Sequence, residues 1–187
     1  MIIGDPNKFA LESEMSQAFE RLSLMGLGFF VIHINGHLYG VRSSDATMLA
    51  NSFDRVSQRL TDRGIHKSSL SLASSEDIAE ALCRALYIDC PADEQFFGLS
   101  VEDFTNSIYE HHLLWAPDGD EAFDDGSHVL QFDVDQKVRL VAFTRVSAGT
   151  ALEQTADLWL PAEDFYAILR SWKEAFQAEW ESRPKSD

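Results

Sequence analysis

The sequence lacks positive charge over a long central stretch. Its 187 residues contain 15 Lys and Arg against 31 Asp and Glu, which gives a formal net charge of −16 at pH 7. From Ala85 to Gln136, 52 consecutive residues include thirteen Asp and Glu but no Lys or Arg. Binding to nucleic-acid phosphates requires clustered Lys and Arg, and an anionic membrane surface attracts the same residues. We therefore expect neither nucleic acid nor a membrane as a partner.

Cysteine pairs, long apolar runs and a secretory leader are also missing. The two cysteines, Cys83 and Cys90, do not form the Cys-x-x-Cys spacing of redox and zinc sites. The longest apolar run, residues 24–32, is too short to cross a bilayer. The N-terminal residues carry no basic leader and no secretory apolar segment. These features predict a cytoplasmic protein whose thiols are reduced and partly buried.

The motifs of common enzyme classes are absent as well. The sequence contains no Gly-x-Ser-x-Gly, no P-loop and no Gly-x-Gly-x-x-Gly. His33 and His37 flank an expected turn and do not converge, while His111 and His112 are adjacent and point apart at a helix end. We predict no catalytic, cofactor-binding or metal-binding residue, and therefore a binding protein rather than an enzyme.

Alternating apolar residues predict the strands. One strand is expected at 8–15 and a hairpin at 29–41, where Asn35-Gly36 suits the positive φ angles of a two-residue turn. A second hairpin is expected at 129–144, and a last strand at 157–160.

Four helices are predicted from apolar residues three or four apart. Leu49 to Leu60 form the first helical pattern, and Ser74 and Ser100 are the expected N-caps of the second and third. A fourth helix follows Pro161, which suits a first helical turn. Its apolar face is expected to be buried and consists of Phe165, Leu169, Trp172 and Phe176.

The order of these elements predicts an α+β fold. We expect a single domain over residues 1–182, with an antiparallel sheet and helices packed mainly on one face. A chain of 187 residues is long enough for one well-packed domain and short for two. Residues 183–187 are expected to form a frayed tail.

The densest acidic segment, residues 115–126, is the candidate partner-binding site. Like charges this close repel one another, and folding does not require such a block. The segment is therefore typical of a surface shaped for a positively charged partner. Its two aromatic residues either anchor that partner or pin the segment to the core. The candidate partner-binding residues are Trp115, Asp118, Asp120, Glu121, Phe123, Asp124 and Asp125.

A cation site and a solvated loop are the alternatives for this segment. An EF-hand loop needs oxygen ligands at positions 1, 3, 5 and 12, and Gly at position 6. Counting from Asp118 places Ala122 and Phe123 at positions 5 and 6, and counting from Asp120 places Ala122 at position 3. The EF-hand register therefore fails. A different divalent-metal site, in an enzyme that uses the carboxylates of Asp118–Asp125, remains an alternative.

Two N-terminal segments resemble a known protein family. Gly4–Phe9 reads Gly-Asp-Pro-Asn-Lys-Phe, and Ile34–Tyr39 reads Ile-Asn-Gly-His-Leu-Tyr. Both are similar to the opening of a family of bacterial immunity proteins that accompany polymorphic toxins, including contact-dependent growth-inhibition toxins. Gly40 departs from the family pattern, which has Pro after Leu-Tyr. The resemblance implies neutralisation of a cognate toxin in the cytoplasm by direct binding, and it assigns no interface residue.

Charge and resemblance together give the functional hypothesis. Many toxins that attack nucleic acid present basic clefts, and a strongly acidic inhibitor is steered to such a cleft at a high rate. We therefore predict an immunity protein that binds a basic, nuclease-like toxin domain. The alternatives are the divalent-metal enzyme and an intracellular adaptor without a toxin partner. The sequence does not predict an oligomeric state.

Overall fold

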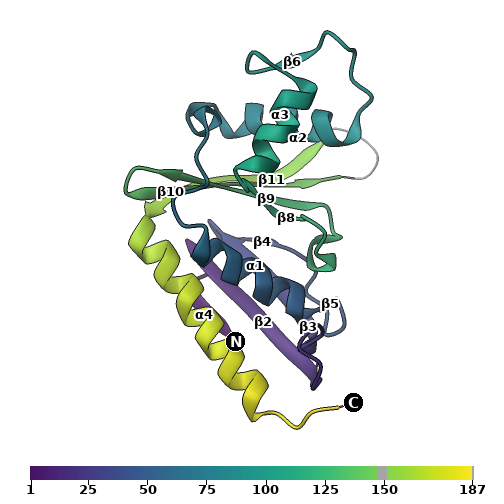
Figure 1. Ribbon diagram of the computed structural model, residues 1–187, viewed down its shortest axis with the longest axis vertical. Coiled ribbons are helices and arrows are strands. Elements are labelled where there is room, and N and C mark those ends of the chain that lie inside the picture. The colour runs from purple at the N-terminus through teal and green to yellow at the C-terminus, as the bar shows by residue number, and fades with distance from the viewer. Residues whose placement is uncertain (147–150, 187) are drawn as a thin grey trace.

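The computed structural model describes residues 1–146 and 151–186 as two antiparallel sheets, a separate small hairpin and four α-helices (Figure 1). The first sheet contains β1 (Ile2–Asp5), β2 (Phe9–Ala18), β3 (Gly26–Ile34), β4 (His37–Tyr39) and β5 (Thr47–Met48). The second contains β8 (Leu114–Ala116), β9 (Ser127–Val134), β10 (Lys137–Arg145) and β11 (Leu152–Pro161). The remaining elements are α1 (Leu49–Thr61), 3₁₀ helix η1 (Ser69–Leu72), α2 (Ser75–Tyr87), β6 (Gln95–Phe96), β7 (Leu99–Ser100), α3 (Val101–Glu110), 3₁₀ helix η2 (Glu121–Phe123) and α4 (Ala162–Ser182).

The first sheet is built around the predicted N-terminal hairpin. Its strands run in the order β1-β2-β3-β4, and β5 also pairs with β3. The turn between β3 and β4 is Asn35-Gly36, with φ angles of 53° and 80°. Both values are positive, as a type I′ turn requires. Across this hairpin His33 lies opposite Leu38 and His37 lies opposite Ile34, so the two histidines are not paired with each other.

The helix caps also follow the local sequence. The Ser74 hydroxyl oxygen accepts a hydrogen bond from the Asp77 backbone N–H at 3.1 Å, and Ser100 does the same for Asp103 at 3.1 Å. These bonds satisfy N–H groups that the first helical turn leaves without partners. The predicted apolar face of α4 is confirmed as buried, with its four residues at most 1% exposed.

Strands β9 and β10 are buried on both of their faces. Val138 and Leu140 point into a core shared with the first sheet, α1 and α4. The alternate residues Val141 and Phe143 point the other way, into a core shared with α2 and α3. Because successive side chains of a strand point to opposite faces, one apolar strand serves two cores. Figure 1 shows α2 and α3 on one side of the second sheet and α1 and α4 on the other.

The predicted α+β class with antiparallel strands is confirmed, and its internal arrangement differs from the expectation. The strands divide into two sheets rather than one, and helices cover both faces of the second sheet. The reason is the double-sided burial of β9 and β10, which requires a layer on each face. Several short strands, namely β1 and β5–β8, were not predicted from the sequence.

The C-terminal residues lie against the first sheet. Ser186 forms a parallel bridge with Phe19, and its backbone N–H donates to the Ala18 carbonyl oxygen at 2.8 Å. The expected frayed tail is thus paired within residues 183–186, and residue 187 lies outside the described residues. Over the described part of the chain, no helix is both long and apolar enough to span a membrane.

Candidate partner-binding site

The candidate segment, residues 115–126, begins in an edge strand and continues through a 3₁₀ turn. Strand β8 pairs with β9, with Leu114 opposite Leu130. The 3₁₀ helix η2 then follows, and Asp120 is its N-cap. Because β8 belongs to the second sheet and η2 contacts β3 and β5 of the first, the segment lies at the seam between the two sheets.

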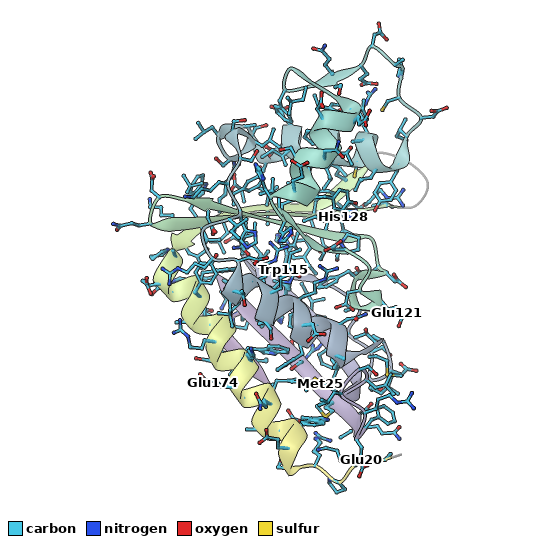
Figure 2. All side chains as sticks on the ribbon, in the orientation of Figure 1. Glu20, Met25, Trp115, Glu121, His128 and Glu174 are labelled. Carbon is cyan, nitrogen blue, oxygen red and sulfur yellow. The ribbon has the colours of Figure 1, made fainter. Side chains whose placement is uncertain are left out.

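The two aromatic residues of the segment are interior residues. Trp115 is 1% exposed and its ring centroid lies 6.1 Å from that of Phe165 in an edge-on arrangement. Phe123 is equally enclosed and meets the Phe30 ring edge-on at 6.2 Å. Figure 2 shows Trp115 within the molecule, close to α1 and the second sheet. Both rings therefore pin the segment to the core, which leaves neither available as an anchor for a partner.

Asp120 is also an interior residue. One carboxylate oxygen accepts from Thr47 Oγ1 at 3.1 Å and from the Ala122 backbone N–H at 3.0 Å. The other accepts from Ser52 Oγ at 2.8 Å. A buried carboxylate is tolerated when hydrogen bonds replace its lost hydration. Asp120 thus ties η2 to β5 and α1.

Asp118 is held by an arginine from α1. Arg55 Nη1 lies 2.6 Å from the Asp118 carboxylate, and Arg55 Nη2 donates to the Asp118 carbonyl oxygen at 2.7 Å. About a quarter of the Asp118 side chain is exposed. The missing positive charge of the central stretch is therefore supplied in part by residues from outside it. A second such pair joins Arg84 to Glu94 at 2.5 Å.

Three carboxylates of the predicted set remain at the surface. Glu121, Asp124 and Asp125 are exposed, and Figure 2 shows Glu121 at the margin of the molecule. Asp125 accepts from the Ser127 and Gly40 backbone N–H groups at 3.0 and 3.2 Å, which fixes its position. Glu121 and Asp124 form no salt bridge with any described residue. The seven predicted residues thus divide into an interior group and an exposed acidic edge.

A polar cleft of about 210 Å³ lies beside Asp118. Its floor includes Arg59, which donates to the carbonyl oxygens of His112 and Leu114 and holds α1 against this part of the chain. Burial lowers the pKa of Arg59 to about 10, so the guanidinium keeps its charge at neutral pH. Burial and the adjacent Arg59 charge lower the pKa of His66 to about 4. His66 is therefore neutral at pH 7, and its contacts serve the packing of this region.

His33, His128 and Cys83 are held in positions that serve the fold. His33 Nε2 lies 2.8 Å from Glu12, which also pairs with Arg42 at 2.6 Å. His128 stacks on a phenylalanine ring, and burial lowers its pKa. Burial raises the pKa of Cys83 to about 11, so this thiol is a poor nucleophile at neutral pH. Over residues 1–146 and 151–186, no three His, Cys, Asp or Glu side chains converge as metal ligands do.

A short hairpin whose turn is Phe97-Gly98 was not predicted from the sequence. The φ angles of these residues are 55° and 80°, close to those of Asn35-Gly36. The glycine between two short apolar runs was the available signal for this turn. The Phe97 side chain is 43% exposed, unlike the aromatic residues of the predicted site.

Comparison with known proteins identifies a family and a fold. A family model described as "Immunity protein 42" (Imm42) matches residues 1–175. No curated protein matches the chain. Among solved structures, the chain is similar to the crystal structure of CdiI from Burkholderia dolosa AUO158, with 18% sequence identity and a TM-score of 0.58. The alignment covers 94% of this chain and 99% of that one. At this identity the similarity establishes the fold alone.

Proposed function

The chain belongs to the Immunity protein 42 family, and from this premise we propose that it neutralises a cognate toxin by binding directly to the toxin domain. The observation that carries the proposal is the family match, which spans residues 1–175 of the 187. The protein acts by occupying a surface that the toxin needs, in the cytoplasm of the cell that it protects. No catalytic step is required of it.

The charge of the molecule supports a basic toxin domain as the partner. A net charge of −16 creates a negative potential that attracts a cationic surface over distances beyond contact. Domains that act on nucleic acid carry such surfaces because they bind phosphates. A nuclease-like toxin is therefore the partner class that this charge fits. The similarity of the fold to CdiI adds a contact-dependent growth-inhibition system as the setting.

Within the candidate segment, we assign the contact to the exposed acidic edge, Glu121, Asp124 and Asp125. These side chains are exposed, and two of them have no salt-bridge partner among the described residues. Trp115, Phe123 and Asp120 act indirectly, because they hold the edge in place from inside the core. Exposed charges of this kind accelerate association more than they strengthen the final complex.

A co-expression experiment tests the function. The protein and the polypeptide encoded immediately upstream are produced together, and we expect them to co-purify as a stoichiometric complex. Cells that produce the upstream polypeptide alone should stop growing, and cells that also produce this protein should grow normally. Unchanged growth arrest in the presence of the folded protein would contradict the proposed function.

A charge variant tests the contribution of the acidic edge. The double variant Glu121→Gln, Asp124→Asn removes two exposed charges without touching the Asp120 network. We expect slower association, on the order of three- to tenfold at low salt, and little change in dissociation. The control is Glu174→Gln, Glu181→Gln, which removes the same charge from exposed positions on α4. Equal association rates for the two variants would exclude a specific role for the acidic edge.

A further inference from the structure

The α2–α3 cap, residues 75–110, carries an unusual share of exposed apolar side chains. It comprises α2, β6, β7 and α3, and stands on the second sheet away from α4 (Figure 1). Of the ten large apolar side chains that are exposed among the described residues, the 36 residues of the cap contribute four. These are Tyr87, Ile88, Phe97 and Tyr109. Of these four, Phe97 lines a groove of the cap, and an exposed aromatic ring beside a groove is typical of an interaction surface.

Phe97 is placed where the local backbone does not favour it. It occupies the first position of the two-residue turn between β6 and β7, with a φ angle of 55°. Asn or Gly suits this left-handed conformation, and Asn35 occupies the equivalent position of the turn between β3 and β4. The Phe97 ring stacks on Phe104 at 6.1 Å and remains 43% exposed. The chain thus presents an aromatic ring at a hairpin tip at a cost in backbone strain.

A groove of about 310 Å³ runs between this hairpin and α2. Phe96 and Phe97 of the hairpin supply apolar lining, and Asp77 and Glu80 of α2 supply exposed carboxylates. Arg84 lies in the groove as well, and its guanidinium is paired with Glu94 at 2.5 Å. The groove therefore offers an apolar surface next to carboxylates that have no salt-bridge partner among the described residues.

The negative charge of the cap favours a positively charged partner in the groove. Residues 75–110 contain nine Asp and Glu and a single Lys or Arg, Arg84. We propose that the groove between α2 and the β6–β7 hairpin, with Phe97 at its rim, is a docking surface for a Lys- and Arg-bearing face of the toxin domain. This inference rests on the proposed function. Phe97 supplies the apolar anchor that the buried Trp115 does not, and Glu80 pairs with a cation of the toxin.

The first test replaces the anchor. Phe97→Asn installs the residue that the other turn uses, so the hairpin geometry is retained while the ring is removed. We expect the dissociation constant for the purified upstream-encoded toxin polypeptide to rise about 30-fold or more, mainly through faster dissociation. The control is Leu22→Asn, which removes another exposed apolar side chain from a position two residues beyond Glu20, at the opposite end of the molecule (Figure 2). This control should bind as the wild type does.

The second test reverses a charge at the groove without altering the core. Glu80 and Glu174 are both exposed glutamates within helices, and neither takes part in a salt bridge among the described residues. Glu80→Lys and Glu174→Lys therefore change the net charge equally. We expect Glu80→Lys to slow association at least about tenfold at low salt, and Glu174→Lys to slow it much less.

The outcomes distinguish a failure of the groove assignment from a failure of the proposed immunity function. If both Phe97→Asn and Glu80→Lys bind the toxin polypeptide as the wild type does, the groove assignment is overturned and the immunity function stands. Failure of the wild-type protein to bind the toxin polypeptide at all would overturn both. If circular dichroism shows that Phe97→Asn is unfolded, the two charge reversals decide alone. A slower association for Glu80→Lys then supports the groove, and equal rates for both reversals contradict it.

Discussion

The interior between the two sheets encloses its aromatic residues, whereas the α2–α3 cap buries some of its aromatic residues and leaves others exposed. In the interior, Trp115, Trp172 and Phe165 are at most 1% exposed and pack ring against ring. In the cap, Phe97 and Tyr109 are more than 40% exposed. Burial of large rings supplies most of the free energy that favours folding. A ring left at the surface contributes little to folding and remains available for binding. This difference supports the proposal that the exposed rings of the cap serve binding, while the enclosed rings serve stability.

The sharpest test of this contrast between enclosed and exposed rings removes one buried indole and one exposed indole, the second of them on β11 outside the cap. Trp172 is fully buried, contacts the Phe30 ring at 5.0 Å, and donates from Nε1 to Ser13 Oγ at 3.1 Å. Trp172→Ala should lower the free energy of unfolding by roughly 3–5 kcal/mol. Trp159 on β11 is 42% exposed, and Trp159→Ala should lower it by about 1 kcal/mol or less. Urea unfolding measures both, and similar losses for the two variants would contradict the comparison.

The carboxylates allow the same contrast between an interior and a surface position. Asp120→Ala leaves the Thr47 and Ser52 hydroxyls without their acceptor and removes the cap of η2. We expect a loss of roughly 2–4 kcal/mol in the free energy of unfolding. Asp124→Ala, four residues further on and exposed, should change it by about 0.5 kcal/mol or less. A small effect of Asp120→Ala in the same urea measurement would show that the network is dispensable.

These contrasts also explain how much the sequence alone could predict. The turn at Asn35-Gly36, the Ser74 and Ser100 caps and the apolar face of α4 depend on neighbouring residues, so local patterns predicted them. The division into two sheets depends on which layers cover β9 and β10. The continuous apolar run of β10 from Leu140 to Phe143 was a signal of burial on both faces, because a strand with one solvated face alternates. Strand β9 gave no such signal, since its apolar and polar residues alternate from Leu130 to Val134. Strands of two residues, such as β6 and β7, carry no period to detect.

The candidate site was less predictable than the fold for a related reason. Composition identified residues 115–126 as acidic and aromatic, but it could not tell inward from outward side chains. Trp115 faces the core between the two sheets, and its neighbour Leu114 faces the other core, because successive side chains of β8 point to opposite faces. Strand β8 is only three residues long, which is too short for a sequence pattern to show this alternation. Arg55, which neutralises Asp118, lies on α1, so the ion pair joins residues distant in sequence. Long-range contacts of this kind decide which acids are free for a partner.

The buried histidines predict a pH dependence that belongs to the interior region. Burial and the Arg59 charge lower the pKa of His66 from 6.5 to about 4. The unfolded chain therefore takes up a proton on this residue before the folded protein does. The contribution of His66 to the free energy of unfolding is complete above about pH 6.5. It declines as the pH falls towards 4, with a slope of up to about 1.4 kcal/mol per pH unit. Urea unfolding at pH 7 and pH 5 measures the decline.

A histidine substitution isolates this contribution. His66→Asn should flatten the dependence between pH 6.5 and 5, whereas His37→Asn, at an exposed position, should leave the slope unchanged. Burial also lowers the pKa of His128, so part of the slope should survive the removal of His66. A wild-type stability that does not change between pH 6.5 and 5 would contradict the neutral, enclosed state of His66.

The smallest expected effect on the free energy of unfolding concerns the Phe97-Gly98 turn of the cap, which has Phe where the Asn35-Gly36 turn has Asn. Asn tolerates the left-handed conformation that Phe97 adopts, so Phe97→Asn relieves backbone strain of about 1 kcal/mol. Loss of the stacking contact with Phe104 offsets part of that gain. We therefore expect the free energy of unfolding to stay within about 1 kcal/mol of the wild-type value.

The reciprocal variant Asn35→Phe acquires the strain and loses the hydrogen bond from Asn35 Nδ2 to the Asp157 carbonyl oxygen, so it should be destabilised by roughly 1–3 kcal/mol. Loss of several kcal/mol in Phe97→Asn would instead make the ring a part of the folded core. The exposed aromatic surface of the cap would then lose its distinction from the interior.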